Sequence, residues 1–323
     1  DVDHAVRHAG FLHDLGQLQT RQRGFFGQLH HDGVAGGQGR GQLPGRHEQR
    51  EVPGDDLTAY ADRFAPAIRD VFAPEVPLIL SGGAVAPAGE VVVSFDRMNK
   101  VLGFDPAGRL LRCQPGVVVA EVAARAEAEG LYYPVDFASA GSAQLGGSVA
   151  TNAGGIKVIR YGMTRQWVAG LRVVTGGGEV LELGRGLVKD NTGYDLKHLV
   201  IGSEGTLGLI TEVTVRLTTP PGPLSVLVLA LPAFPDVMKV LSTFERAVPV
   251  TAFEFFSELA LQKVVARGDL NRPFPEPAPF YALIEFEGDG EAALEAFEHC
   301  LEAGWASDGV ISQSGEQAAR LWR

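Results

Sequence analysis

Residues 141–155 read GSAQLGGSVATNAGG, and this stretch decides between the possible folds. It contains five glycines, three alanines, two serines and a threonine, so almost no bulky side chain interrupts it. Glycine-rich segments let a backbone approach another group closely, or adopt dihedral angles that a Cβ forbids. From this stretch alone, a packed turn, a phosphate site and a site for a flat cofactor all remain open.

Two familiar nucleotide-binding patterns do not fit the stretch. The Walker A pattern GxxxxGK[ST] is excluded, because no lysine follows the glycines at the required spacing. The dinucleotide pattern GxGxxG is not supported either, because no strand–turn–helix unit with an acidic residue downstream surrounds the glycines.

Three further glycine-bearing segments lie near the ends of predicted strands. They are Ser81-Gly82-Gly83, Pro115-Gly116 and residues 202–213, which read GSEGTLGLITEV. Turns of this kind can converge on one ligand, with backbone N–H groups directed at an anion. The four segments together therefore favour a single binding site.

The pattern between these segments predicts an α+β fold. Two hairpins are expected, with turns at Pro106-Ala107-Gly108 and at residues 176–178. Helical spacing predicts a helix at 118–130 that ends at Gly130, and a short helix near 194–199 capped by a residue of 190–192. Residues 207–217 alternate as a strand does.

A proline-rich break at residues 220–223 predicts a domain boundary. Strands are expected beyond it near 224–232, 253–257 and 280–288. Helices are expected at 235–247, 257–268 and 290–304. We therefore predict a second α+β domain with its helices on one face of a sheet.

Composition narrows the classes of function. The chain has 323 residues, 45% of them apolar, and a net charge of −11. This charge argues against a protein that binds nucleic acid through phosphate contacts. The two cysteines do not suggest a disulfide framework, and no apolar run reaches the length of a transmembrane segment.

Residues 1–56 differ from the rest of the chain. The first fifty contain six of the eight histidines and no lysine, and their glycine-rich part has no helical or strand periodicity. A histidine-rich metal site is one interpretation, but no ligand pattern supports it, and we predict no metal site. A disordered or non-native leader is the other interpretation. After it, apolar residues at helical spacing predict a helix at 57–72.

The quoted segments resemble the FAD-binding core of the vanillyl-alcohol-oxidase/PCMH flavoprotein superfamily, and within it the FAD-linked oxidases of D-2-hydroxy acids. Three stretches carry the resemblance: QPGV (114–117), PVDFASAGSAQLGGSVATNAGGIKVIRYG (134–162) and KDNTGYDLKHLVIGSEGTLGLITEVTVRL (189–217). The resemblance implies a two-subdomain PCMH-type FAD-binding domain at 57–218. It implies the beginning of an α+β cap domain, with an antiparallel sheet plus helices, at 223–323.

The resemblance also implies which residues line FAD. They are Gly82, Gly83, Pro115, Gly116, Ser142, Gly146, Gly147, Thr151, Asn152, Gly154, Gly155, Glu204, Gly205 and Ile210. Members of the family carry a longer glycine turn where this chain has Pro77-Leu78-Ile79. The family's catalytic histidine and metal ligands have no counterpart here, and His198 and His299 do not match the catalytic position. No catalytic residue is therefore assigned, and the expected base lies beyond the C-terminus.

The implied reaction is oxidation of a D-2-hydroxy acid of the 2-hydroxyglutarate, lactate or glycolate type to the 2-oxo acid. The implied electron acceptor is an electron-transfer flavoprotein or a quinone, and the implied location is cytoplasmic or peripheral to the membrane. We expect this chain to be a fragment with little or no turnover. Two alternatives remain open: a non-catalytic flavin-binding remnant, and a non-redox branch such as alkylglycerone-phosphate synthase.

Overall fold

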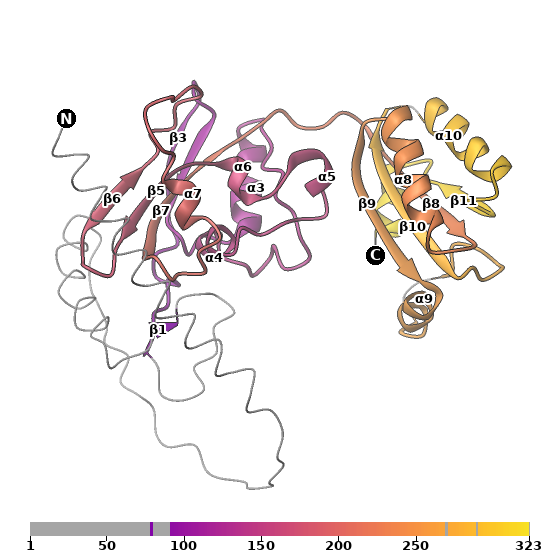
Figure 1. Cartoon of the computed structure of the whole chain (residues 1–323), viewed down its shortest axis with the longest axis horizontal. Helices are drawn as coiled ribbons and strands as arrows, with labels where there is room; N and C mark the ends of the chain where they lie inside the picture. Colours follow the sequence, from indigo (N-terminus) through magenta and orange to yellow (C-terminus); the bar gives the residue numbers. More distant parts are fainter. Residues whose placement is uncertain (1–77, 80–90, 269–270, 289, 323) are drawn as a thin grey trace, which may run out of the picture.

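The computed structural model describes residues 78–79, 91–268, 271–288 and 290–322. Two β-sheets with their own helices are joined by an extended connection around residues 218–223 (Figure 1). The atypical leader, the helix expected at 57–72 and the turn containing Gly82 and Gly83 lie outside the described residues.

The N-terminal sheet has five strands in the order β3-β4-β7-β5-β6, and all neighbours are antiparallel. A separate parallel pair precedes it. The strands are β1 (Leu78–Ile79), β2 (Val91–Val92), β3 (Val101–Asp105), β4 (Leu110–Cys113), β5 (Val168–Val174), β6 (Val180–Leu183) and β7 (Leu209–Arg216). The central position of β7 joins the two predicted hairpins, β3–β4 and β5–β6, into one sheet.

Both hairpin predictions are confirmed, and the turn residues explain why. In the first turn, the Asp105 carboxylate accepts a hydrogen bond from the Ala107 N–H at 3.0 Å, which is the usual role of an aspartate in a turn. In the second, the Gly178 N–H bonds to the Thr175 carbonyl at 2.9 Å, and Gly178 has φ +81°. Glycine adopts this conformation without steric cost.

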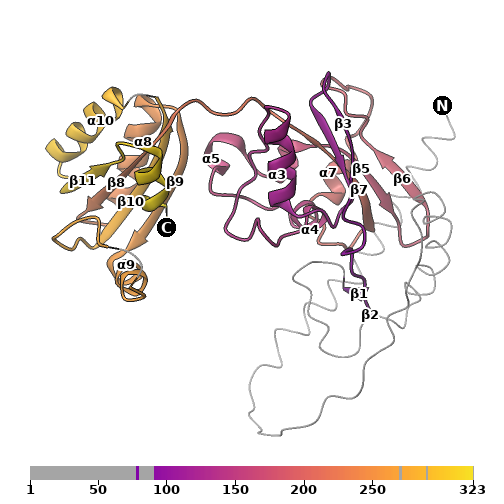
Figure 2. The same ribbon diagram turned by 180° about the vertical axis from the view of Figure 1, so that it is seen from behind.

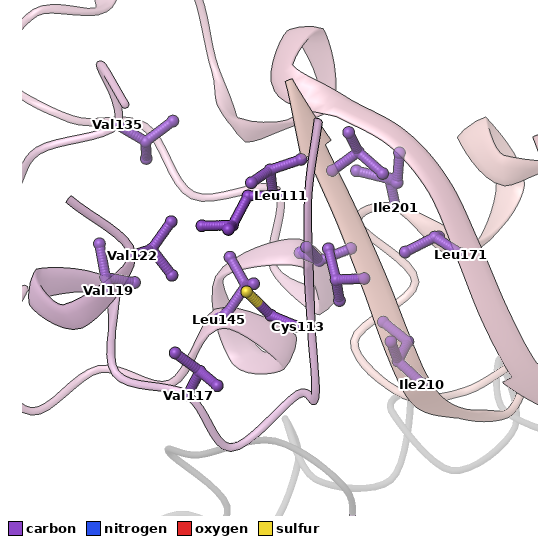
Figure 3. Close-up of a cluster of buried hydrophobic side chains, with 14 of the residues drawn as sticks. Leu111, Cys113, Val117, Val119, Val122, Val135, Leu145, Leu171, Ile201 and Ile210 are labelled. Carbon is purple, nitrogen blue, oxygen red and sulfur yellow. The ribbon is translucent and has the colours of Figure 1, made fainter. Parts of the chain in front are cut away.

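Helices accompany this sheet, and most of them contribute residues to its hydrophobic core. They are α3 (Val119–Ala128), α4 (Leu145–Ala150), α5 (Val158–Tyr161), α6 (Thr164–Trp167) and α7 (Lys197–Val200). Figure 3 shows Val119 and Val122 of α3, Leu145 of α4 and strand residues such as Leu111 gathered in one cluster. The predicted helix at 118–130 is confirmed, with Gly130 at φ +68° just after it.

The short helix expected near 194–199 begins later than predicted. Its first residue is Lys197, and no side chain caps it. The Asp190 carboxylate instead accepts a hydrogen bond from the Thr192 N–H at 3.1 Å. Asp190 therefore stabilises a local turn upstream of the helix.

The C-terminal sheet has four antiparallel strands in the order β11-β8-β10-β9. Its strands and helices are β8 (Leu224–Leu231), α8 (Asp236–Ala247), β9 (Val250–Ser257), α9 (Glu258–Val265), β10 (Phe280–Glu287), α10 (Glu291–Glu302), β11 (Asp308–Ile311) and α11 (Gly315–Leu321). The strands and helices expected here from periodicity are confirmed to within a few residues.

The two faces of the C-terminal sheet pack against different partners. Helices α8 and α10 cover one face, and their apolar residues join those of the strands in a buried cluster. On the other face, residues of α9 and α11 pack against alternate residues of β8 and β10. The prediction that the helices lie on one face of this sheet is therefore wrong, because β8 and β10 carry apolar residues that are buried on both faces. Helix α5 of the N-terminal part contacts the edge strand β9, and Figure 2 shows the same arrangement from behind. Among the described residues, no helix is both long and apolar enough to cross a membrane.

Candidate functional site

A cavity of about 900 Å³ opens beside helix α4. Residues from four separate parts of the chain form its walls. These parts are the segment after β2, the turn after β4, residues 137–154, and the turn before β7 with the first two residues of β7. The lining residues are Val93, Ser94, Phe95, Asp96, Pro115, Phe137, Ser139, Ser142, Ala143, Gln144, Gly146, Gly147, Ser148, Ala150, Thr151, Ala153, Gly154, Gly205, Gly208, Leu209 and Ile210.

Helix α4 positions the glycine-rich wall of the cavity. The N–H groups of Leu145 and Gly146 bond to the carbonyls of Val117 and Pro115 at 2.8 and 2.7 Å. Leu145 and Val149 then point into the core. Residues one turn apart share a face of a helix, so Gly147 and Thr151 lie together on the other side, where both line the cavity.

Three of the glycines are required by close contacts between backbone segments. A Cβ on Gly116 would lie 2.1 Å from the Phe95 carbonyl oxygen, and one on Gly155 would lie 2.1 Å from the Asp136 carbonyl oxygen. A Cβ on Gly146 would lie 2.5 Å from the Cβ of Pro115. The packed-turn interpretation therefore holds for these three positions. At Gly154 a Cβ would make only ordinary contacts at 3.6 Å, so close packing does not explain that glycine.

The turn before β7 meets the end of α4 through its backbone. The Gly202 and Glu204 N–H groups bond to the carbonyls of Val149 and Ala150 at 3.1 and 2.8 Å. Glu204 has φ +53°, and Asn152 has φ +49°. A positive φ is uncommon for residues other than glycine, and such backbone strain is concentrated at functional sites.

Asn152 supports the cavity wall from behind. Its side-chain oxygen accepts a hydrogen bond from the Arg165 N–H at 3.0 Å. The Arg165 guanidinium in turn donates to the Ile201 carbonyl at 2.9 Å. These bonds connect the end of the glycine-rich stretch to the loop after α7.

The fourteen residues expected around FAD fall into three groups. Those that line the cavity are Pro115, Ser142, Gly146, Gly147, Thr151, Gly154, Gly205 and Ile210. Those that adjoin it without lining it are Gly116, Asn152, Gly155 and Glu204. Gly82 and Gly83 lie outside the described residues.

Sequence reasoning missed several lining residues. Phe95 and Asp96 follow a β-branched run and contain no glycine signal, so nothing in the local pattern indicated them. Gly208 could have been found, since it belongs to the quoted segment 202–213. Its φ of +154°, with the Val174 carbonyl oxygen 2.5 Å from where a Cβ would lie, explains why glycine stands there.

The cavity has both apolar and polar walls and is nearly uncharged. Asp96 is the one charged residue among the described residues that line it, and its carboxylate accepts a hydrogen bond from the Gln144 amide at 2.6 Å. Hydroxyl groups come from Ser139, Ser142 and Thr151. An anion there would be held by N–H and O–H groups, since no described lysine, arginine or histidine lines the cavity.

The described histidines lie away from this cavity. Burial is the main factor that lowers the pKa of His198. Lys197 and Arg165 lower it further, and Asp195 opposes them. His299 packs its ring edge-to-face against Trp305. Over the described residues, no group of three or more His, Cys, Asp or Glu side chains could hold a metal ion.

Two domain families match the chain, and between them they cover all strands of the two sheets except β7. The FAD binding domain matches residues 79–184, and the C-terminal domain of FAD linked oxidases matches residues 221–323. The chain therefore contains an FAD-binding domain and the C-terminal domain of FAD linked oxidases. The match of residues 79–184 to the FAD binding domain, with that of the C-terminal domain, indicates FAD as the cofactor.

Curated relatives match most of this chain. D-2-hydroxyglutarate dehydrogenase of Stutzerimonas stutzeri (strain A1501) is 55% identical over 300 residues, which are 83% of this chain and 65% of the relative. The enzyme of the same name from Xanthomonas citri pv. viticola is 55% identical over 76% of this chain and 52% of the relative. The chain thus spans about half to two thirds of the length of these relatives.

Solved structures support the same fold. Two structures of alkyldihydroxyacetonephosphate synthase align with TM-scores of 0.60 and 0.61, at 22% and 21% identity. Each covers 80% of this chain, and the chain covers 53% and 52% of them. At this identity the likeness concerns the fold alone. The predicted α+β PCMH-type architecture with an FAD-linked oxidase cap is confirmed.

Proposed function

We propose that the chain forms the FAD site and part of the cap of an enzyme that oxidises a D-2-hydroxy acid to the 2-oxo acid. The observation that carries the proposal is the cavity beside α4, where three of the predicted glycine-bearing segments meet. The names of the two relatives at 55% identity favour D-2-hydroxyglutarate among the possible substrates.

The residues around the cavity fit a dinucleotide with a flat ring system. Gly147, Gly154 and Gly205 leave the wall free of side chains, so main-chain groups can approach a cofactor closely. Ser142 and Thr151 offer hydroxyl groups, and Phe95, Phe137 and Leu209 offer apolar surface. We assign the twelve described residues predicted from the sequence to this site, with Gly116, Asn152, Gly155 and Glu204 as supports behind its wall. Gly82 and Gly83 remain predictions from the family resemblance.

The chemistry would be divided between cofactor and protein. FAD, when bound, supplies the acceptor for the hydride that leaves the substrate carbon. The chain's own residues bind the cofactor, orient it and exclude water from one side of it. We assign no proton acceptor to a described residue, because His198 and His299 do not line the cavity.

Cofactor uptake is the first test. Purified chain incubated with FAD and desalted should show the flavin absorbance band near about 450 nm, because the bound cofactor carries that chromophore. Failure to retain flavin would refute the assignment of the cavity.

A pair of glycine variants tests the position of the cofactor. Gly147→Leu places a branched side chain on the cavity side of α4, and leucine favours a helix more than glycine does. Gly315→Leu is the matched control, since Gly315 is the first residue of α11 and no described atom lies within 4 Å of where its Cβ would be. We expect Gly147→Leu to lose FAD binding and Gly315→Leu to retain it. Equal retention by both would contradict the assignment.

Turnover distinguishes the proposed reaction from the alternatives. Flavin bleaching and dye reduction are measured with D-2-hydroxyglutarate, D-lactate and glycolate, both for this chain and for a version extended to the length of its relatives. Reduction by D-2-hydroxyglutarate in the longer version alone would indicate that this chain is a flavin-binding portion. No reduction by any hydroxy acid in the longer version would favour a non-redox branch of the superfamily.

We further propose that an electron-transfer flavoprotein or a quinone accepts the electrons. We also propose that the protein is located in the cytoplasm, either free or associated with the surface of a membrane. Two buried free cysteines, Cys113 and Cys300, suit a reducing compartment. Reoxidation of the reduced flavin by each acceptor would test the choice of partner.

A further inference from the structure

An ion pair is buried between the FAD-binding domain and the C-terminal domain. Lys157 Nζ lies 3.0 Å from Glu285 Oε1, and the two side chains are only 10% and 7% exposed. Lys157 immediately precedes α5, and Glu285 lies within β10. The pair therefore crosses from one domain to the other at the contact between α5 and the C-terminal sheet (Figure 1).

The Glu285 carboxylate also joins three elements within the C-terminal domain. Its Oε1 accepts a second hydrogen bond from the Thr251 hydroxyl of β9 at 2.7 Å. Its Oε2 accepts one from the Trp322 indole N–H at 3.1 Å, immediately after α11. Both carboxylate oxygens thus have named donors, as a buried charge requires.

Each residue of the pair is connected to a residue that lines a cavity. On the N-terminal side, the Ile156 N–H bonds to the Asp136 carbonyl at 2.9 Å, and Gly154, three residues before Lys157, lines the cofactor cavity. On the C-terminal side, Trp322 lines a second cavity of about 610 Å³ over the β8–β10 face. The Lys157–Glu285 pair is therefore the link between the two walls.

We propose that Lys157 and Glu285 form an ionic joint that fixes the orientation of the C-terminal domain relative to the Gly154 wall of the cofactor cavity. Lys157 and Glu285 are positioning residues in this joint, since neither lines the cofactor cavity. Replacing one charge leaves the other buried without a counter-charge, which is far more costly than losing an exposed pair. The joint is a property of the interface and does not depend on which substrate the enzyme uses.

The same interface supplies a matched control. Arg160 and Glu287 also pair across it, but at 3.8 Å and with side chains 46% and 23% exposed. An exposed pair of this kind contributes little to stability. Glu287→Gln therefore makes the same chemical change as Glu285→Gln, two residues away on the same strand.

Amide hydrogen exchange of the whole chain tests the joint. In Glu285→Gln, an NH₂ group replaces one of the two carboxylate oxygens. If it replaces Oε2, it faces the Trp322 indole N–H, and if it replaces Oε1, it faces the Thr251 hydroxyl and the Lys157 ammonium. In either case a donor faces a donor. We expect exchange in α5 and β9 to become at least about tenfold faster than in the wild type, because local opening increases. Glu287→Gln is expected to remain within about twofold. Equal rates in the two variants would overturn the joint.

A second variant keeps the test decisive if Glu285→Gln folds poorly. Lys157→Met removes the ammonium while keeping an apolar stem, and the double variant Lys157→Met with Glu285→Gln removes both charges. Since the largest cost is an unpaired buried charge, the double variant should exchange more slowly than Glu285→Gln alone. If the increase in exchange rate in the double variant equalled the product of the increases in the two single variants, the two charges would act independently and the proposed coupling between them would be wrong.

The positioning role has its own measurement. The FAD dissociation constant, followed by flavin fluorescence, should rise about fivefold in Glu285→Gln and stay unchanged in Glu287→Gln. If Glu285→Gln left the FAD dissociation constant unchanged, the proposal that this ion pair positions the cavity wall would be wrong. If wild-type protein bound no FAD, the proposed function would fail, while the exchange measurement would still test the joint.

Discussion

Replacing Gly155 with alanine should destabilise the protein even when no cofactor is present. An added Cβ would lie 2.1 Å from the Asp136 carbonyl oxygen, and 2.9 Å from both the N and the carbonyl C of the same residue. All three atoms belong to the backbone, so no side-chain rotation can relieve the contact. A carbon and a carbonyl oxygen normally approach to about 3.3 Å, so one segment must move by about 1 Å.

The expected magnitude follows from what that movement disrupts. The Ile156 N–H bonds to the same Asp136 carbonyl at 2.9 Å, and losing such a bond costs about 1 kcal/mol. Forcing extra atoms into a packed site costs about 1–3 kcal/mol more. The lower entropy of an unfolded chain with alanine offsets about 0.4–1 kcal/mol. We therefore expect Gly155→Ala to lower the free energy of unfolding by about 1–3.5 kcal/mol.

Urea unfolding of the cofactor-free protein measures this change, with amide exchange of β5 and β7 used to follow the N-terminal sheet separately. Gly103→Ala is the control, because Gly103 lies in β3 and, in the part of the chain that the structure describes, no atom lies within 4 Å of the position of its Cβ. That variant should match the wild type or be slightly more stable. If Gly155→Ala stayed within about 0.5 kcal/mol of the wild type, the steric argument would be wrong.

Two further predictions concern titrating groups in the two domains. Hydrogen bonds from the Arg272 guanidinium and then the Tyr281 hydroxyl lower the pKa of Glu258 from 4.5 to about 2. The stability that Glu258 contributes should therefore be complete above about pH 4.5 and be lost as the pH falls toward 2, whereas Glu258→Gln should remove this part of the pH dependence of urea unfolding. Burial, with Glu121 and Glu212 nearby, raises the pKa of the Cys113 thiol to about 12, so Cys113 should not react with a thiol reagent at pH 8 until urea unfolds the protein. Rapid labelling of Cys113 in the folded chain, identified by peptide mass mapping, would show that the thiol is accessible.

Local sequence patterns predicted the regular elements well where a single short-range rule applies. The hairpin around Pro106-Ala107-Gly108 and the helix ending before Gly130 follow from turn and capping preferences. Helix α4 was not predicted, because Gly146 and Gly147 disfavour a helix. Its first turn is held by the carbonyls of Val117 and Pro115, about thirty residues earlier in the chain, and no local rule reports such a contact.

The glycine pattern of the sequence predicted part of the candidate site. Three of the four glycine-bearing segments contribute residues to the cavity lining, and the fourth, Ser81-Gly82-Gly83, lies outside the described residues. Glycine does not reveal which group it approaches. Asp96 and Phe95 were missed because they reach the cavity through tertiary packing after an ordinary strand. The Lys157–Glu285 pair was missed because its members are 128 positions apart and each looks like an ordinary surface residue in the sequence.

The glycines of the opening stretch serve two physical purposes, and the distinction separates folding from cofactor binding. Gly146 and Gly155 are fixed by backbone groups within 3.2 Å of where a Cβ would lie, so a larger residue there must affect the folded protein with or without FAD. Gly147 lines the cavity on the face of α4 opposite Leu145 and Val149, so a larger residue there would take up space that we assign to the cofactor. If the stretch existed only to make tight turns, Gly147→Leu would leave FAD binding intact. If it existed only to admit the cofactor, Gly155→Ala would leave the cofactor-free protein as stable as before. Observing the loss of stability in one variant and the loss of FAD in the other requires both purposes within one fifteen-residue segment.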